Sequence, residues 1–127
     1  MTGYLLVFLG AGIGGALRHA VNVACAKACG VAFPWGTLAV NVAGSFVMGV
    51  LAGWLAVRAG EGWSGPARLF VATGILGGFT TFSAFSLDAV VLWERGAPAT
   101  AVAYVAASVL LSLGGLLAGL AVARSVA

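Results

Sequence analysis

The chain has 127 residues, of which 62% are hydrophobic and only 7% are charged, and its formal net charge is +3. A soluble domain carries about a quarter charged residues, so this chain cannot build a water-exposed surface or form a soluble catalytic domain. The six basic residues are scattered, and no run of them predicts binding to nucleic acid.

Four apolar segments follow one another along the chain, at about 3–27, 35–57, 66–93 and 98–123. About 20 apolar residues are enough to cross a bilayer as a helix. We therefore predict an all-α membrane protein, with a single four-helix transmembrane domain over residues 1–127. Pro34, Pro66 and Pro98 stand at the starts of the last three segments, and proline suits the first turn of a helix. Ser64 is placed to act as the N-cap of the third segment.

Each segment also contains two glycines spaced as G-x-x-x-G: Gly10 and Gly14, Gly49 and Gly53, Gly74 and Gly78, Gly115 and Gly119. Such spacing lets the backbones of membrane helices approach one another closely. It predicts a packed bundle and says nothing about function. Cys25 and Cys29 have too few nitrogen or sulfur ligands nearby for a metal site, so we expect them to be packing residues.

Basic residues show almost no preference for one side of the predicted bundle. With four spans, both termini share a side, which holds three of them: Arg58, Arg68 and Arg124. The other side holds Lys27, Arg95 and, depending on the depth of its side chain, Arg18. Because excess positive charge normally fixes orientation, one interpretation is insertion both ways and pairing as an antiparallel dimer. The alternative is a single orientation fixed by other signals.

Two rows of neutral polar residues run along predicted helices at intervals of about four. The second segment has Thr37, Asn41 and Ser45, and the fourth has Thr100, Tyr104, Ser108 and Ser112. Neutral donors can solvate a small anion without trapping it. Serine and threonine hydroxyls alternatively bond back to their own helix or join neighbouring helices. The amide of Asn41 cannot be satisfied so locally, which makes this residue the strongest candidate.

The third segment contains GGFTTFSAFS at 77–86, where a simple membrane anchor would be aliphatic. We predict that its helix breaks here. Backbone carbonyls freed at membrane depth must face protein, water or an ion, and neutral carbonyls suit a monovalent cation such as sodium. Phe82 and Phe85 are three residues apart, so their electropositive ring edges can flank an anion. Ordinary hydrophobic packing is the alternative.

Three strings resemble signatures of the Fluc, or CrcB, family of fluoride channels: GGALR at 14–18, GTLAVN with the following GSF at 36–46, and the segment from Thr73 to Ser86. They occur in the family's order, and the resemblance covers essentially the whole chain. His19 and Ala84 depart from the pattern, where an aromatic residue and a threonine are expected. The resemblance implies a passive, fluoride-selective channel in the cell (inner) membrane, which confers fluoride resistance and is not an enzyme.

The same resemblance implies an antiparallel, dual-topology homodimer with two fluoride pathways and a structural sodium ion (Na+) at its centre. It assigns eight residues to the fluoride path: Asn41, Thr81, Phe82, Ser83, Phe85, Tyr104, Ser108 and Ser112. The backbone carbonyls of Gly77 and Thr80 would hold the sodium. Arg18 would draw anions to the entrance, or alternatively extend its side chain to the membrane interface.

Two other functions suit a small four-span protein. A multidrug exporter needs a membrane-buried carboxylate to exchange protons for cationic drugs, and Asp88 is the only candidate within the spans. A purely structural subunit would have no reason for a broken third helix. The resemblance implies that the partners are fluoride, the lipid bilayer and a second copy of the chain, and the scattered basic residues predict no binding to nucleic acid.

Overall fold

The computed structural model describes residues 1–126, and all of their regular secondary structure is helical. Its elements are α1 (Thr2–Cys29), α2 (Trp35–Ala56), α3 (Ser64–Ala67), η1 (Arg68–Leu76), α4 (Gly77–Phe79), α5 (Phe82–Glu94) and α6 (Pro98–Val126). Four stretches are long and apolar enough to cross a membrane: α1, α2, the run from Ser64 to Glu94, and α6. The predicted four spans are confirmed, and the chain is a multi-pass membrane protein.

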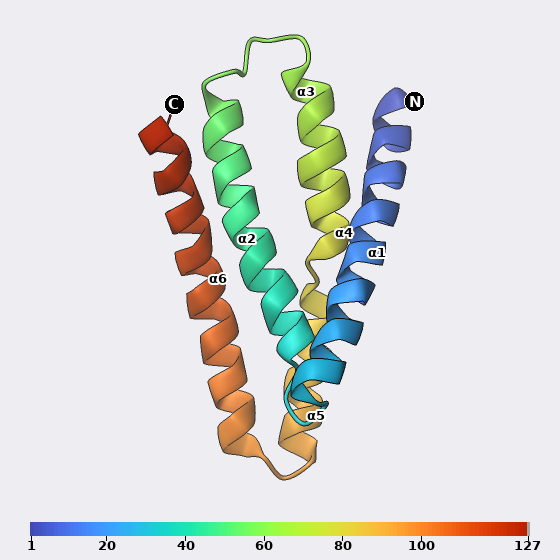
Figure 1. Cartoon of the computed structure of the whole chain (residues 1–127), viewed down its shortest axis with the longest axis vertical. Coiled ribbons are helices and arrows are strands. Elements are labelled where there is room, and N and C mark those ends of the chain that lie inside the picture. Colours follow the sequence, from blue (N-terminus) through green and yellow to red (C-terminus); the bar gives the residue numbers. More distant parts are fainter. Residues whose placement is uncertain (127) are drawn as a thin grey trace.

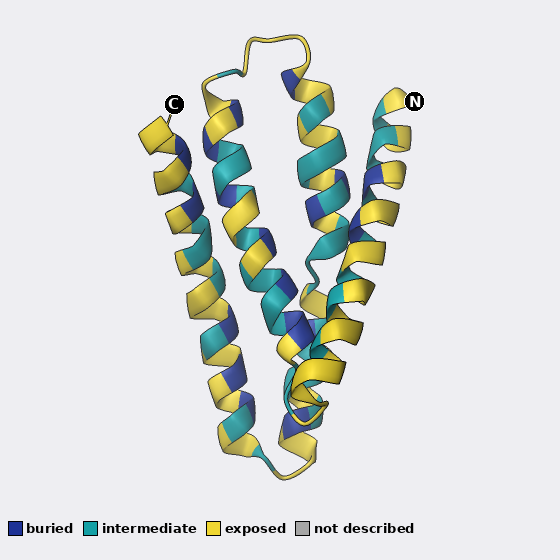
Figure 2. Ribbon diagram, in the orientation of Figure 1, coloured by how far each residue is buried: buried dark blue, intermediate teal, exposed yellow. Residues whose placement is uncertain are grey.

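The spans pack in two close pairs. α2 lies along α6, while α1 lies against η1 and α4 (Figure 1). Both chain ends lie at the same end of the bundle, as an even number of spans requires (Figure 1). Few residues are buried, and most large apolar side chains on the outer faces are exposed (Figure 2). An apolar exposed surface is the expected exterior of a protein whose solvent is lipid.

Glycines allow the close approach in both pairs. A methyl group added at Gly14 would collide with the carbonyl oxygen of Ile75 in η1, and one at Gly119 would collide with the carbonyl oxygen of Phe46 in α2. The backbones therefore touch where any larger residue would separate them. The packing expected from the G-x-x-x-G spacing is confirmed.

The third span departs from a regular α-helix twice. Residues Arg68–Leu76 form a π-helix, which no sequence pattern predicts. The chain then becomes extended at Thr80 (φ −85°, ψ 158°) and Thr81 (φ −155°, ψ 120°) before α5 begins. Thr81 caps α5, because its hydroxyl accepts a hydrogen bond from the backbone N–H of Ala84 at 3.2 Å. The predicted break in the third helix is confirmed.

The expected N-cap at Ser64 is wrong. Ser64 is itself the first residue of α3, and Trp63 occupies the cap position. The Ser64 hydroxyl donates to the carbonyls of Glu61, at 2.7 Å, and Ala59, at 3.3 Å. The hydroxyl therefore closes the preceding turn instead of capping the helix N-terminus.

Candidate functional site

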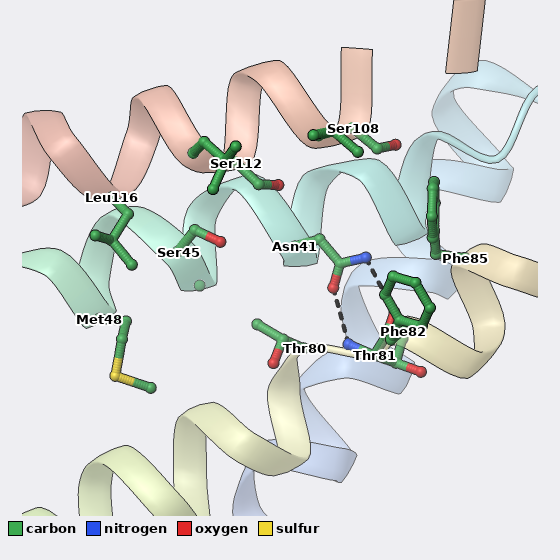
Figure 3. Close-up of a pocket in the computed structure, with 13 residues that line it drawn as sticks. Asn41, Ser45, Met48, Thr80, Thr81, Phe82, Phe85, Ser108, Ser112 and Leu116 are labelled. Carbon is green, nitrogen blue, oxygen red and sulfur yellow. Dashed lines mark hydrogen bonds between the residues drawn. The ribbon is translucent and has the colours of Figure 1, made fainter. Parts of the chain in front are cut away.

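A cavity of about 400 Å³ lies where α2, α6 and the broken third span meet (Figure 3). Its polar lining residues are Asn41, Ser45, Thr80, Thr81, Ser108 and Ser112, and its other lining residues are Gly44, Met48, Phe82, Phe85, Val109, Leu113 and Leu116. None of these side chains carries a formal charge. The cavity therefore offers neutral hydrogen-bonding groups on an otherwise apolar wall at membrane depth.

Asn41 spans the cavity from α2 to the break. Its Oδ1 accepts from the backbone N–H of Thr81 at 2.8 Å, and its Nδ2 donates to the carbonyl of Thr81 at 3.1 Å (Figure 3). A methyl group at Gly44, three residues later, would collide with the Thr80 side chain. This glycine lets the break lie directly on α2. One Nδ2 proton of Asn41 is not used by the pair with Thr81.

The backbone carbonyls just before the break, at the end of η1 and in α4, have different partners. That of Leu76 accepts from both the amide and the hydroxyl of Thr80, each at 3.0 Å. That of Gly78 accepts from Nε of Arg18 at 3.1 Å. Within residues 1–126, the structure gives no hydrogen bond to the carbonyl of Gly77 or of Thr80.

The two phenylalanines of α5 have unequal environments. Their ring centroids are 5.4 Å apart, with the planes tilted by 54°. Phe85 is 8% exposed and packs against Tyr104 at 5.3 Å between centroids, whereas Phe82 is 77% exposed. Phe85 is fixed by its surroundings, and Phe82 lies at the open side of the cavity.

Ser108 carries the one buried side-chain polar atom that lacks a hydrogen-bond partner in the described part of the chain. The residue is 5% exposed and lines the cavity together with Ser112. A buried hydroxyl without a partner costs free energy, about 1–3 kcal/mol in mutational studies. A ligand in the cavity could therefore complete the hydrogen bonding of this hydroxyl.

Tyr104 and Ser83 do not line this cavity, although the sequence interpretation assigned both to the same path. Tyr104 is completely buried, and its hydroxyl donates to Oδ2 of Asp88 at 3.2 Å. Ser83 is exposed, with its hydroxyl 3.3 Å from that of Thr81. The phenol and carboxylate form a separate pair in the adjoining core, which the sequence did not reveal because 16 residues separate them.

The structure brings the other six assigned path residues to one cavity: Asn41, Thr81, Phe82, Phe85, Ser108 and Ser112. Sequence reasoning missed Gly44, Met48 and the side chain of Thr80 as lining residues. The helical spacing of Gly44, Ser45 and Met48 from Asn41 was a usable signal, because positions three, four and seven residues apart share a face. Arg18 lies outside the lining, half-buried and bonded to Gly78.

No cluster of three or more histidine, cysteine or acidic side chains is placed to hold a metal in residues 1–126. Cys25 and Cys29 are both free thiols. If an ion binds at this site, the available ligands are neutral oxygens of the backbone and of hydroxyl groups.

The model of the family described as CrcB-like protein, Camphor Resistance (CrcB), matches residues 5–120. The chain is 56% identical over 121 residues to the fluoride-specific ion channel FluC 2 of Nitrobacter hamburgensis, covering 95% of this chain and 96% of the relative. It is 54% identical over 123 residues to the fluoride-specific ion channel FluC of Rhodopseudomonas palustris, covering 97% and 98%. The chain belongs to the CrcB/FluC family.

Proposed function

We propose that this protein is a fluoride-specific channel that lets cytoplasmic fluoride leave the cell by passive diffusion, not an enzyme. The names of its relatives describe those proteins as fluoride-specific ion channels. The observation in the molecule itself that best supports the proposal is the unpartnered hydroxyl of Ser108 in a cavity without formal charge. A small anion that accepts hydrogen bonds would satisfy this hydroxyl.

The proposed path uses neutral donors. Asn41 offers its remaining amide proton, and Ser108 and Ser112 offer hydroxyl protons from α6. Phe82 and Phe85 offer electropositive ring edges in a wall that would otherwise repel an anion. Fluoride is small and strongly hydrated, so replacement of its water by closely placed donors favours it, while a narrow passage excludes chloride.

Tyr104 and Ser83 belong to the proposed path less directly, because they do not line the cavity. Tyr104 supports Phe85 by ring packing and already donates its proton to Asp88. Thr81 and Ser83 share a hydroxyl contact at the start of α5. We propose that the hydroxyls of Tyr104 and Ser83 continue the polar route beyond the cavity, and that Arg18 attracts anions toward the cavity through the N–H groups that Gly78 does not engage.

We propose that the working unit is an antiparallel, dual-topology homodimer. The nearly equal numbers of basic residues at the two ends support insertion in both orientations. The ring of Phe82 is exposed at the open side of the cavity, and this exposure fits a dimer in which a second copy of the chain closes that side. Two copies related by a two-fold axis in the membrane plane would create two equivalent pathways.

We further propose a structural sodium ion, held by the carbonyls of Gly77 and Thr80. Their lack of hydrogen bonds within residues 1–126 fits this role, since carbonyls at membrane depth need a partner. Neutral oxygen ligands suit a hard monovalent cation. The ion would supply positive charge next to a cavity that has no cationic side chain in its lining.

Passive flow is sufficient for export. Hydrogen fluoride enters cells as a neutral molecule and ionises in the less acidic cytoplasm. An inside-negative potential then drives the anion outward by about 2.3 kcal/mol per 100 mV, roughly a 50-fold concentration ratio. No energy-coupled pump is needed.

A multidrug exporter is less well supported. Such a protein needs a carboxylate accessible from its substrate site. Asp88 instead accepts a hydrogen bond from buried Tyr104 and does not line the cavity. A purely structural subunit would not explain the unpartnered Ser108 hydroxyl or the broken span.

The proposal is tested by reconstituting the purified protein in liposomes loaded with potassium fluoride. After valinomycin is added to carry potassium, a fluoride electrode should record rapid efflux, and a chloride electrode should record almost none from matched potassium chloride liposomes. Protein-free liposomes give the background. Fluoride efflux equal to that background would contradict the proposed function, and equal efflux of both anions would contradict its selectivity.

A further inference from the structure

The end of α4 lies inside a membrane span, so its last carbonyls lose their usual helical partners. In an unbroken helix, the carbonyls of residues 76–79 would accept from the amides of residues 80–83. Only Leu76 keeps this pairing, to Thr80 at 3.0 Å. The amide of Thr81, which would otherwise bond to the Gly77 carbonyl, donates to Asn41. Contacts from the other spans therefore determine which carbonyls at the break remain without a hydrogen bond.

Arg18 provides the second contact from another span to the backbone at the break. Its Nε donates to the carbonyl of Gly78 at 3.1 Å, across 60 residues of sequence. The hydrogen bond is charge-assisted, which makes it stronger than one between neutral groups. A cation at the end of a helix also offsets the partial negative charge of its last carbonyls. With Gly78 occupied, the carbonyls of Gly77, Phe79 and Thr80 are the ones at the break for which the described part of the chain gives no hydrogen bond.

The backbone contact between α1 and the third span fixes the position of Arg18. Gly14, one turn before Arg18, touches the Ile75 carbonyl so closely that no side chain fits, and a methyl group at Gly78 would collide with the Ala11 carbonyl. Arg18 is half-buried at the end of this contact. The Arg18 side chain therefore reaches Gly78 from a helix whose position is fixed by close backbone contact with the third span.

We propose that Arg18 is a positioning residue for the cation site at the break. By holding the Gly78 carbonyl, it keeps the carbonyls of Gly77 and Thr80 in the arrangement that binds sodium. This inference rests on the sodium site of the proposed function. This positioning role differs from attraction of anions to the entrance. It depends on the hydrogen bond that Nε donates, and not on long-range attraction by the positive charge.

Two substitutions at this position separate the donor from the charge. Arg18→Gln places an amide nitrogen the same number of bonds from the backbone as Nε, so it keeps a donor and loses the charge. Arg18→Met has similar length and no donor. Lys27→Met is the matched control, because it removes a positive charge from an exposed position of α1 far along the helix from the break.

The measurement is thermal unfolding of the purified protein in detergent without fluoride, followed by tryptophan fluorescence, as sodium replaces N-methylglucamine. We expect Arg18→Met to raise the sodium concentration for half-maximal stabilisation about tenfold, the scale of one charge-assisted hydrogen bond. Arg18→Gln should raise it less, about threefold, because its donor is no longer charged, and Lys27→Met should leave it within about twofold of the parent protein. A general loss of packing would lower all melting temperatures without moving this midpoint.

Three results would overturn the inference. An unchanged midpoint in Arg18→Met would remove the role of the donor, and equal shifts in the Gln and Met variants would assign the effect to charge. Absence of any sodium response in the parent protein would reject the sodium site itself. That last result is distinct from failure of the channel function, because fluoride efflux from liposomes is measured separately. Reduced efflux in Arg18→Gln, with a sodium midpoint well below that of Arg18→Met, would support the donor role and add a role for the charge at the entrance.

Discussion

The side-chain amide of Asn41 pairs with the backbone of Thr81 across the break in the third span, accepting at 2.8 Å and donating at 3.1 Å. This is the geometry of a peptide group hydrogen bonded at both edges. It satisfies two backbone groups that the broken helix would otherwise leave unpaired at membrane depth. Asn41 is therefore both a support of the break and, through its second amide proton, a donor facing the cavity.

We predict that Asn41→Asp reduces fluoride efflux at least about tenfold, since a buried group left without its partner costs about 1–3 kcal/mol. The substitution removes the donor to the Thr81 carbonyl and sets a possible negative charge in the anion path. Efflux is measured with a fluoride electrode on liposomes. Ser86→Ala is the control, because that hydroxyl donates only to its own helix at Phe82. Parent-like efflux in Asn41→Asp would exclude Asn41 from the path.

We predict that Ser108→Ala reduces fluoride efflux without lowering thermal stability. The Ser108 hydroxyl has no partner in the described part of the chain, so its removal should leave thermal stability unchanged or raise it slightly. Fluoride efflux should nevertheless fall severalfold. Ser125→Ala, on the same helix, removes an exposed hydroxyl bonded to the Val122 carbonyl and should change neither quantity. A variant at Ser108 that is destabilised but conducts normally would indicate a structural role only.

The sequence predicted the four spans and the break because their signals are local. Apolar runs of sufficient length define the spans, and the GGFTTFSAFS string places glycines and hydroxyls where a continuous helix would be aliphatic. The partners of Asn41 and Arg18 were not predictable in this way. Those contacts join residues 40 and 60 positions apart and depend on how closely the spans pack.

Two other features have no local signal. No residue pattern within Arg68–Leu76 predicts the π-helix of η1, whose backbone lies in close contact with α1. The position of Tyr104 beside Asp88 depends on the angle between α5 and α6. The four-residue spacing with Ser108 and Ser112 correctly placed all three on one helix, but drift around the axis left Tyr104 out of the cavity.

We predict that the protein inserts in both orientations. The native thiols Cys25 and Cys29 are replaced by alanine, and one cysteine is added after the C-terminus. A membrane-impermeant maleimide applied to intact cells should label about half of the added cysteines, relative to permeabilised cells, because the basic residues barely favour one side. Labelling of nearly all or nearly none would contradict dual topology and, with it, the antiparallel dimer.

The sharpest prediction concerns the two rings of α5, because their burial differs. Phe82→Ile and Phe85→Ile both keep apolar bulk and remove the electropositive ring edge. Phe85 is 8% exposed and packs on Tyr104, so its replacement should also cost about 1–3 kcal/mol through altered packing. Phe82 is 77% exposed in the protomer, so its replacement should cost the protomer little. We expect both variants to lose most fluoride efflux, and Phe82→Ile to do so without loss of folding.

Size-exclusion elution and thermal unfolding separate the two causes, and Leu87→Ile, an exposed substitution on the same helix, is the control for changes of apolar shape. Phe82→Tyr keeps the ring and should retain much more efflux than Phe82→Ile. If Phe82→Ile conducts fluoride like the parent while remaining folded, the exposed ring is not part of the path. If Phe85→Ile alone loses efflux in proportion to its loss of stability, both rings are packing residues and the anion does not depend on their edges.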